Sequence, residues 1–231
     1  MRLVCILLLK FIKEEVRMDK IYWNNYYQQH GKDKGISKHS SYAQFCVDNF
    51  FTEKKMNIVE LGSGNGRDAI FLAHHGHNVI AIDQSTTAID IEKQSLHAEI
   101  GQNLNPKALD FIQEDYTQYE KIDVFYSRFS IHSITKDDEA LLLPNVYSAL
   151  NSNGLFCIEV RTTKDPLCGV GEACGENTFI TDNHKRRFID SKVFREQVSD
   201  LGFKELYFTE ENNLSIYKND NPVLMRIILQ K

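Results

Sequence analysis

Apolar and polar residues follow two different spacings along this chain. Short continuous apolar runs predict buried strands, whereas apolar residues that recur every three or four positions predict amphipathic helices. The strands predicted in this way are 57–61, 78–83, 108–113, 123–127 and 155–160, with two further β-rich runs at 203–209 and 223–229. The predicted helices are 67–75, 86–100, 137–150 and 191–201. This alternation predicts an α/β fold in which helices surround a parallel sheet.

The connection between the first two predicted strands is rich in glycine. The first strand gives way to the motif GSGNG at 62–66. Alternating glycines let the backbone take conformations closed to other residues and approach a ligand closely. The helix that begins at Arg67 adds unpaired N–H groups in its first turn. The second strand ends in Asp83, whose carboxylate can accept two hydrogen bonds from a ribose diol. Together these residues predict a nucleoside site.

Four segments of the chain, in this order, resemble the motifs of the class I S-adenosylmethionine-dependent methyltransferases. The first two are the glycine turn and Asp83. The third is Asp115, which follows an apolar run where the family places an acid or amide against the adenine amino group. The fourth, 122–127, matches the strand that borders the methyl-transfer site. The resemblance covers residues 55–160 and implies a Rossmann-like, seven-stranded, mostly parallel sheet with helices on both faces and an antiparallel last strand.

The same resemblance implies S-adenosyl-L-methionine as the cofactor and S-adenosyl-L-homocysteine as its product. Glu60 would face the cationic amino-acid part of the cofactor, and Asp83 would face the ribose. The cofactor-binding residues implied in this way are Glu60, Gly62, Ser63, Gly64, Gly66, Arg67, Asp83, Gln84, Asp115, Tyr116 and Ser127. A nicotinamide-dependent oxidoreductase is the main structural alternative, but it requires the spacing G-x-G-x-x-G, which this turn lacks.

Composition fits one soluble α/β domain. The 231 residues are 42% hydrophobic and 26% charged, which suffices for one sizeable core. The net charge of −5 argues against a nucleic-acid partner, because phosphate backbones select basic surfaces. The five cysteines include no C-x-x-C pair, so we expect neither a disulfide framework nor a zinc site. We therefore expect a cytoplasmic location. The histidines at 74, 75 and 77 end a predicted helix and complement its dipole, so we expect no metal.

The N-terminal part of the chain precedes the resemblance. Residues 1–17 contain a seven-residue apolar run that is too short to span a membrane. We expect residues 1–17 to be an upstream extension or a mis-called start, and the alternative is a short amphipathic helix packed on the domain. The domain itself covers 18–231. Residues 19–51 predict a helical cover. Its aromatic residues at 22, 23, 26 and 27 share one helix face and either pack as core or place one ring over the cofactor.

A long segment at 161–190 is the least generic part of the chain. Such a long connection in a compact domain is usually functional or mobile, and this one carries the run HKRRF. A solvated charged face is one explanation. The alternative is an anion pocket, because guanidinium groups bind phosphate or carboxylate oxygens through paired hydrogen bonds. The substrate-binding candidates are Arg161, His184, Arg186 and Arg187.

Two catalytic candidates, Arg128 and His132, lie just beyond the predicted fourth strand. Ligands of open α/β sheets bind at the carboxyl ends of the strands, which is where these side chains fall. His132 could act as a general base or as a hydrogen-bond donor to phosphate. The alternative is a histidine that caps the next helix.

The segments YSRFSIHSI, IEVRTTKD and HKRRF also resemble a subgroup of these methyltransferases associated with bacterial surface-polysaccharide assembly, such as capsule or O-antigen. Some members methylate phosphate groups or phosphate-bearing sugar precursors, including phosphoramidates. This resemblance implies O-methylation of a small anionic acceptor. A sugar hydroxyl or another small molecule is an alternative acceptor. A second alternative is a non-catalytic module that only binds S-adenosylmethionine, although neither the glycine turn nor Asp83 is lost.

Overall fold

The computed structural model describes residues 20–33, 38–51, 55–95, 101–181 and 184–231. The predicted extension at 1–17 lies outside these residues. Among the described helices, none is long and apolar enough to cross a membrane. The aromatic segment forms a helix over 20–30.

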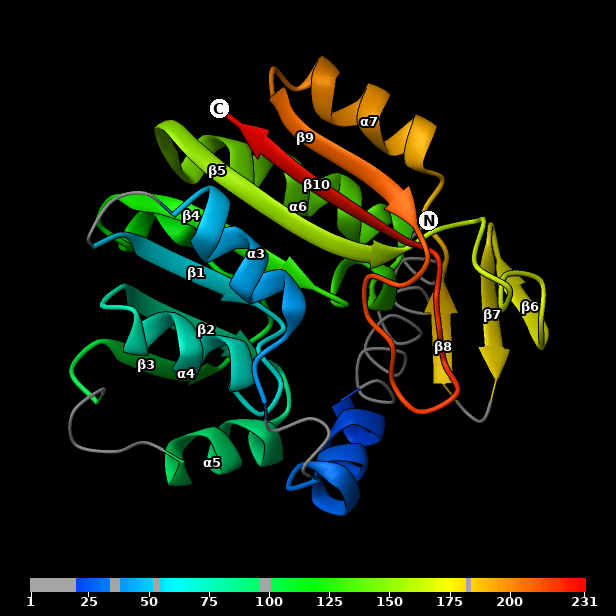
Figure 1. Cartoon of the computed structure of the whole chain (residues 1–231), viewed down its shortest axis with the longest axis horizontal. Coiled ribbons are helices and arrows are strands. Elements are labelled where there is room, and N and C mark those ends of the chain that lie inside the picture. Colours follow the sequence, from blue (N-terminus) through cyan, green and yellow to red (C-terminus); the bar gives the residue numbers. More distant parts are fainter. Residues whose placement is uncertain (1–19, 34–37, 52–54, 96–100, 182–183) are drawn as a thin grey trace, which may run out of the picture.

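A seven-stranded sheet forms the centre of the fold, in the order β3-β2-β1-β4-β5-β10-β9 (Figure 1). Strand β10 runs antiparallel to both of its neighbours, and the other pairs are parallel. This arrangement confirms the predicted fold class. The strands are β1 (Asn57–Leu61), β2 (Asn78–Asp83), β3 (Leu104–Ala108), β4 (Ile122–Arg128), β5 (Leu150–Arg161), β9 (Lys204–Glu211) and β10 (Leu224–Gln230).

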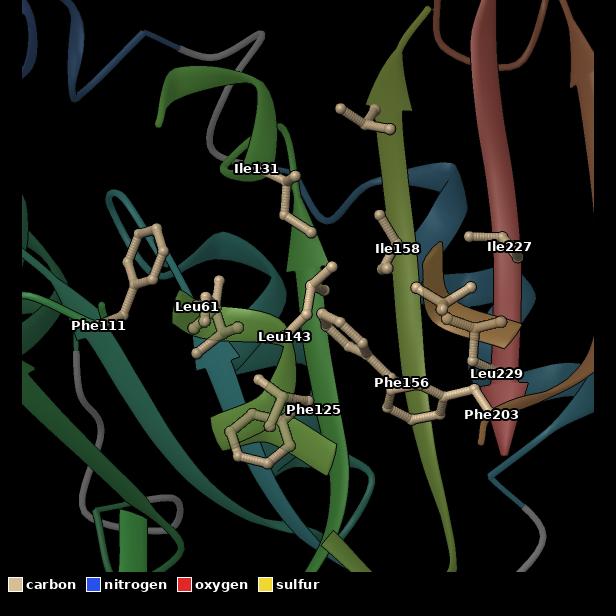
Figure 2. Packing of buried hydrophobic residues seen from close by; sticks show 14 of the residues in the cluster. Leu61, Phe111, Phe125, Ile131, Leu143, Phe156, Ile158, Phe203, Ile227 and Leu229 are labelled. Atoms are coloured by element: carbon tan, nitrogen blue, oxygen red, sulfur yellow. The ribbon is translucent and has the colours of Figure 1, made fainter. Parts of the chain in front are cut away.

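Helices pack on both faces of this sheet, because strand residues alternate between two buried clusters. Ile58 and Val124 contribute to the cluster beneath helices α3 (Ser41–Asn49) and α4 (Arg67–His74). The helix α5 (Thr86–Gln94) packs beside β2 and β3. The opposite cluster includes residues of α6 (Lys136–Ala149) and α7 (Ser191–Asp200), and Figure 2 shows Leu143, Phe125 and Phe156 meeting in it.

The segment 161–190 contains a separate three-stranded antiparallel sheet, which the apolar pattern did not predict. Its strands are β6 (Glu172–Gly175), β7 (Thr178–Thr181) and β8 (His184–Arg187). Their side chains are mostly exposed or half-buried, so they give no strong periodic signal. Figure 1 shows this small sheet standing apart from the seven-stranded one.

The third strand lies at 104–108 and not at 108–113, where the apolar run predicted it. Strand β3 is an edge strand with the sequence LNPKA, and only Leu104 in it is fully buried. Proline is tolerated at an edge because its missing N–H faces no partner strand. The apolar run that follows turns Phe111 into the core instead. The residues that follow β3 therefore lie at other places in the fold than the apolar run predicts.

Two leucines of α6 test this packing. Leu143 is fully buried and Leu141 is 57% exposed. Leu143→Ala should lower the free energy of unfolding by about 2–5 kcal/mol, because it removes transfer free energy and leaves a cavity. Leu141→Ala should change it by less than about 0.5 kcal/mol. Urea denaturation of the two variants gives both values, and equal losses would contradict the assignment of the two faces of α6.

Candidate functional site

A cavity of about 620 Å³ opens at the carboxyl ends of the central strands. The glycine turn, helix 20–30, the end of β4 and the loop between β9 and β10 (212–223) supply its walls. The strand order reverses between β1 and β4, which is where open α/β sheets bind ligands. The size falls within the range of small-molecule sites.

The glycine turn has the backbone geometry that its sequence predicts. The three glycines at 62, 64 and 66 have φ angles of +73°, +59° and +77°. Gly66 is the N-cap of α4, which begins at Arg67. A Cβ atom at Gly64 would lie 2.1 Å from the hydroxyl oxygen of Tyr27. Neither the backbone conformation nor the space admits a side chain at this position.

Asp83 lies on the cavity wall at the end of β2. Its two carboxylate oxygens accept hydrogen bonds from the backbone N–H groups of Gly64 (2.9 Å) and Ser85 (2.8 Å). Each oxygen keeps a further lone pair for a ligand hydroxyl. Burial raises the pKa of Asp83 to about 6. Gln84 lines the cavity next to it.

Carboxylates gather around the turn. Glu60 is 4% exposed, and its Oε2 atom has no hydrogen-bond partner among the described residues. Burial and the neighbouring charges of Asp68 and Glu92 raise the pKa of Glu60 well above its usual range. Glu92, on α5, packs against Gly66 and accepts a hydrogen bond from Ser63 (3.3 Å). A cationic ligand group would offset this accumulation of negative charge.

Sequence reasoning missed Glu92, because its contact with the turn is made only through the tertiary fold. No local pattern in α5 distinguishes this glutamate from a solvated one, yet it is fully buried. Burial raises its pKa to about 8.

Three of the four aromatic residues of helix 20–30 line the cavity, namely Trp23, Tyr26 and Tyr27. Tyr27 lies over the glycine turn. Its ring stacks with that of Trp23, and the two ring centroids are 6.0 Å apart. Tyr22 instead stacks on His184 at 4.7 Å. The helix therefore closes one side of the cavity, and a direct contact between one of these rings and a ligand stays a prediction.

The structure does not bring Asp115 or Tyr116 to the cavity. Asp115 is exposed and caps a short 3-10 helix, η1 (Tyr116–Gln118), and Tyr116 is buried with its hydroxyl donating to the Phe111 carbonyl oxygen. The cause is the earlier position of β3, because the residues at its carboxyl end are 109–111. Phe111 lines the cavity in their place.

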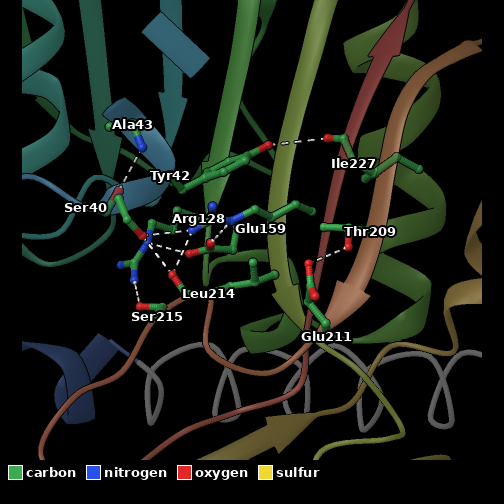
Figure 3. Close-up of polar contacts among 12 residues, drawn as sticks. Ser40, Tyr42, Ala43, Arg128, Glu159, Thr209, Glu211, Leu214, Ser215 and Ile227 are labelled. Carbon is green, nitrogen blue, oxygen red and sulfur yellow. Dashed lines mark hydrogen bonds and ion pairs between the residues drawn. The ribbon is translucent and has the colours of Figure 1, made fainter. Parts of the chain in front are cut away.

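The end of β4 carries Ser127 and Arg128. Ser127 is fully buried, with its hydroxyl oxygen 2.6 Å from that of Ser130, which lines the cavity. Arg128 also lines the cavity and donates from Nε to Glu159 (2.7 Å) and from Nη2 to Ser215 (2.8 Å) (Figure 3). The guanidinium group of Arg128 is thus fixed by protein partners.

His132 lies in the 3-10 helix η2 (Ile131–Ser133) and lines a separate cavity of about 190 Å³. It is 5% exposed, and its Nδ1 atom has no hydrogen-bond partner among the described residues. Burial, and then the charges of Arg186 and Arg161, hold its pKa well below its usual range. The N-cap of α6 is Thr135, so His132 does not cap that helix.

The basic residues of 161–190 separate into two groups. Arg161 lines the large cavity and forms ion pairs with Asp165 (2.9 Å) and Asp220. Burial, and then the charge of Arg161, lowers the pKa of Arg186, which forms no ion pair within the described part of the chain. The same influences, with Arg186 foremost among the charges, lower the pKa of His184 to about 3.

Arg187 belongs to the second group and corrects the expectation of one continuous anion pocket. It is buried, pairs with Glu139 of α6, and donates to the carbonyl oxygens of Ile134 (3.1 Å) and Ile131 (3.3 Å). On a β-strand, consecutive side chains point to opposite faces. Arg186 and Arg187 are neighbours on β8, so only one of the two can face the same side as Arg161.

Comparison with known proteins agrees with this geometry. Residues 58–154 match a family model described as a methyltransferase domain. No curated protein matches the sequence. Among solved structures, a S-adenosylmethionine-dependent methyltransferase from Methanosarcina mazei has a TM-score of 0.68 at 15% identity, over 80% of this chain and 96% of that chain.

Two further solved structures were determined with bound ligands. The 1,6-didemethyltoxoflavin-N1-methyltransferase of Burkholderia thailandensis, with S-adenosylhomocysteine and 1,6-didemethyltoxoflavin, has a TM-score of 0.69 at 14% identity, over 95% of this chain and 89% of that chain. The glycopeptide N-methyltransferase MtfA, with S-adenosylhomocysteine, has a TM-score of 0.66 at 15% identity, over 84% and 90%. This chain therefore has the fold of the S-adenosylmethionine-dependent methyltransferases, and its residues 58–154 match the model of a methyltransferase domain.

Proposed function

We propose that this protein transfers the methyl group of S-adenosylmethionine to an oxygen atom of a small anionic acceptor. The observation that carries the proposal is the polarity of one cavity. Glu60, Asp68 and Asp83 line it with Arg67 around the glycine turn, and Arg128 and Arg161 line it at the ends of β4 and β5. A cationic cofactor fits the acidic side, and an anionic acceptor fits the basic side.

The residues at the turn fit S-adenosylmethionine. Asp83 has further lone pairs for the ribose hydroxyls. The Oε2 atom of Glu60, which has no hydrogen-bond partner among the described residues, suits the cationic amino-acid part. Trp23 and Phe111 add apolar surface to the same cavity. When bound, S-adenosylmethionine supplies an electrophilic methyl group attached to a sulfonium.

The protein's part in such a transfer is alignment and exclusion of water, because the reaction is an in-line displacement. A phosphate or carboxylate oxygen is already anionic and needs no base. A hydroxyl acceptor would require His132 or His184 to take its proton. Both histidines are poor bases, since burial and nearby arginines lower their pKa values. This favours an acceptor oxygen that carries its own negative charge.

We further propose that the acceptor is a phosphate- or phosphoramidate-bearing precursor of a surface glycan and that it is methylated in the cytoplasm. This finer proposal rests on the sequence resemblance and on the arginines near the cavity. The two ligand-bound neighbours are N-methyltransferases by name, so they do not support oxygen as the acceptor atom. A sugar hydroxyl is the second candidate, favoured by the Nδ1 atom of His132, which has no hydrogen-bond partner in the described part of the chain. Incubation with labelled methyl donor and a panel of phosphates, carboxylates and neutral sugars tests both.

Gly64→Val tests the cofactor site. The added side chain would meet the Tyr27 hydroxyl and force a β-branched residue into a left-handed backbone conformation. Calorimetric titration with S-adenosylhomocysteine should show binding weakened by at least about 2 kcal/mol, or abolished. Gly175→Val, in β6 away from the turn, is the matched control and should bind normally. A folded Gly64→Val protein with parental affinity would refute the placement of the cofactor.

The pKa of Asp83 predicts how cofactor binding depends on pH. Only the ionised carboxylate can accept hydrogen bonds from both ribose hydroxyls while it keeps those from Gly64 and Ser85. The affinity for S-adenosylhomocysteine should therefore be constant above the pKa of about 6. It should fall as pH drops below that value, by at most about tenfold per pH unit. Asp83→Asn should bind weakly and lose this slope, and an unchanged slope would assign the titration to another group.

Arg186→Gln tests the acceptor side. If the guanidinium group of Arg186 binds the acceptor anion, kcat/KM for the acceptor should fall by an equivalent of about 2–4 kcal/mol, with cofactor affinity nearly unchanged. Arg195→Gln is the control, because Arg195 of α7 is an exposed arginine that pairs with Glu205 of β9 and does not line the large cavity. If Arg186→Gln turns over every identified acceptor at the parental rate, the charged run HKRRF has a structural or surface role and does not bind the acceptor.

A further inference from the structure

Arg161 forms ion pairs with two carboxylates that differ in their exposure to solvent. Its own side chain is 7% exposed, so its charge is nearly removed from water. Asp165 is fully buried, accepts the N–H group of Leu167 (2.8 Å), and belongs to the same turn of chain. Asp165 is therefore a fixed partner. Asp220, the other carboxylate, has a side chain that is 43% exposed and arrives from the loop 212–223.

Asp220 makes no other side-chain hydrogen bond within the described part of the chain. Its backbone pairs with Tyr217 through two hydrogen bonds of 3.0 and 2.9 Å, which close a short turn. The earlier part of the loop is held independently, because Leu214 and Ser215 accept hydrogen bonds from Arg226 and Arg128. The contact with Arg161 can therefore open without releasing the loop from the sheet.

We propose that Asp220 is a resident counter-anion of Arg161 and that the anionic group of the acceptor displaces it during binding. This inference rests on the proposed function and specifies its acceptor subsite. Both side chains line the large cavity, so the displaced contact opens toward the ligand space. Asp220 thereby determines specificity, since only a ligand group with comparable negative charge can replace it.

Charge balance supports the exchange. Arg161 and Arg186 lie close enough for the first to lower the pKa of the second, and Asp165 and Asp220 both act on Arg186. With Asp220 in place, the formal charges of these two arginines and two aspartates sum to zero. When Asp220 leaves, one positive charge remains in a poorly solvated site, and such a site binds one anionic oxygen group far better than a neutral one. A hydroxyl group offers no comparable replacement.

Asp220→Asn separates this proposal from a purely structural ion pair. The probe is inorganic phosphate, titrated into the complex of the protein with S-adenosylhomocysteine. Removal of the competing charge should tighten phosphate binding by about tenfold. If Asp220 is only a structural partner of Arg161, its substitution should leave the phosphate affinity unchanged or make it weaker. Glu176→Gln is the control, because Glu176 is an exposed partner of Lys136 outside the large cavity. Hydrogen exchange at Tyr217 and Asp220 should accelerate in the parent when phosphate binds.

The outcomes are distinguishable from failure of the proposed function. Equal or weaker phosphate binding by Asp220→Asn overturns the displacement and leaves the anionic acceptor standing. No phosphate binding by either protein overturns both. Asp220→Ser serves as a second variant with a smaller side chain. Tighter binding by both Asp220 variants but not by Glu176→Gln supports the proposal.

Discussion

The buried carboxylate of Glu159 organises the wall of the cavity. It lies on β5 with a fully buried side chain, and it accepts hydrogen bonds from Nε of Arg128 on β4 (2.7 Å) and Nε of Arg226 on β10 (2.6 Å). Arg226 continues to Ser41 at the start of α3, and both arginines reach the loop 212–223. Figure 3 shows Glu159 and Arg128 with Leu214 and Ser215. One carboxylate thus connects three strands, a helix and a loop.

Such a network is costly to disrupt. Loss of one partner from a buried ion pair leaves an uncompensated charge, which typically destabilises a protein by about 3–5 kcal/mol. Loss of Arg128 in particular would also remove the hydrogen bond that it donates to Ser215, which lines the cavity. The position of Arg128 after β4 predicts a catalytic role for it. Its two fixed partners favour a role in shaping the wall, and a direct catalytic role stays a prediction.

Local signals made much of the fold predictable. The glycine turn and Asp83 could be found because strand, turn and helix are each encoded within a few residues. Prediction failed where a tertiary partner decides the outcome. Asp115 was misplaced because the polar edge strand β3 carries no apolar run. Arg187 was assigned to the acceptor because its partner Glu139 lies 48 residues away along the chain. The contribution of the loop 212–223 to the cavity has no local signature.

The polar sequence of β3 has a further effect on the isolated molecule. An edge strand presents unpaired backbone groups that can recruit a strand from another chain and begin aggregation. Pro106 removes one donor from this edge, and Asn105 and Lys107 flank it with polar side chains. The feature that obscured β3 from sequence reasoning is therefore one that discourages intermolecular sheet extension, so a more easily recognised strand at this position would make the protein more prone to aggregate.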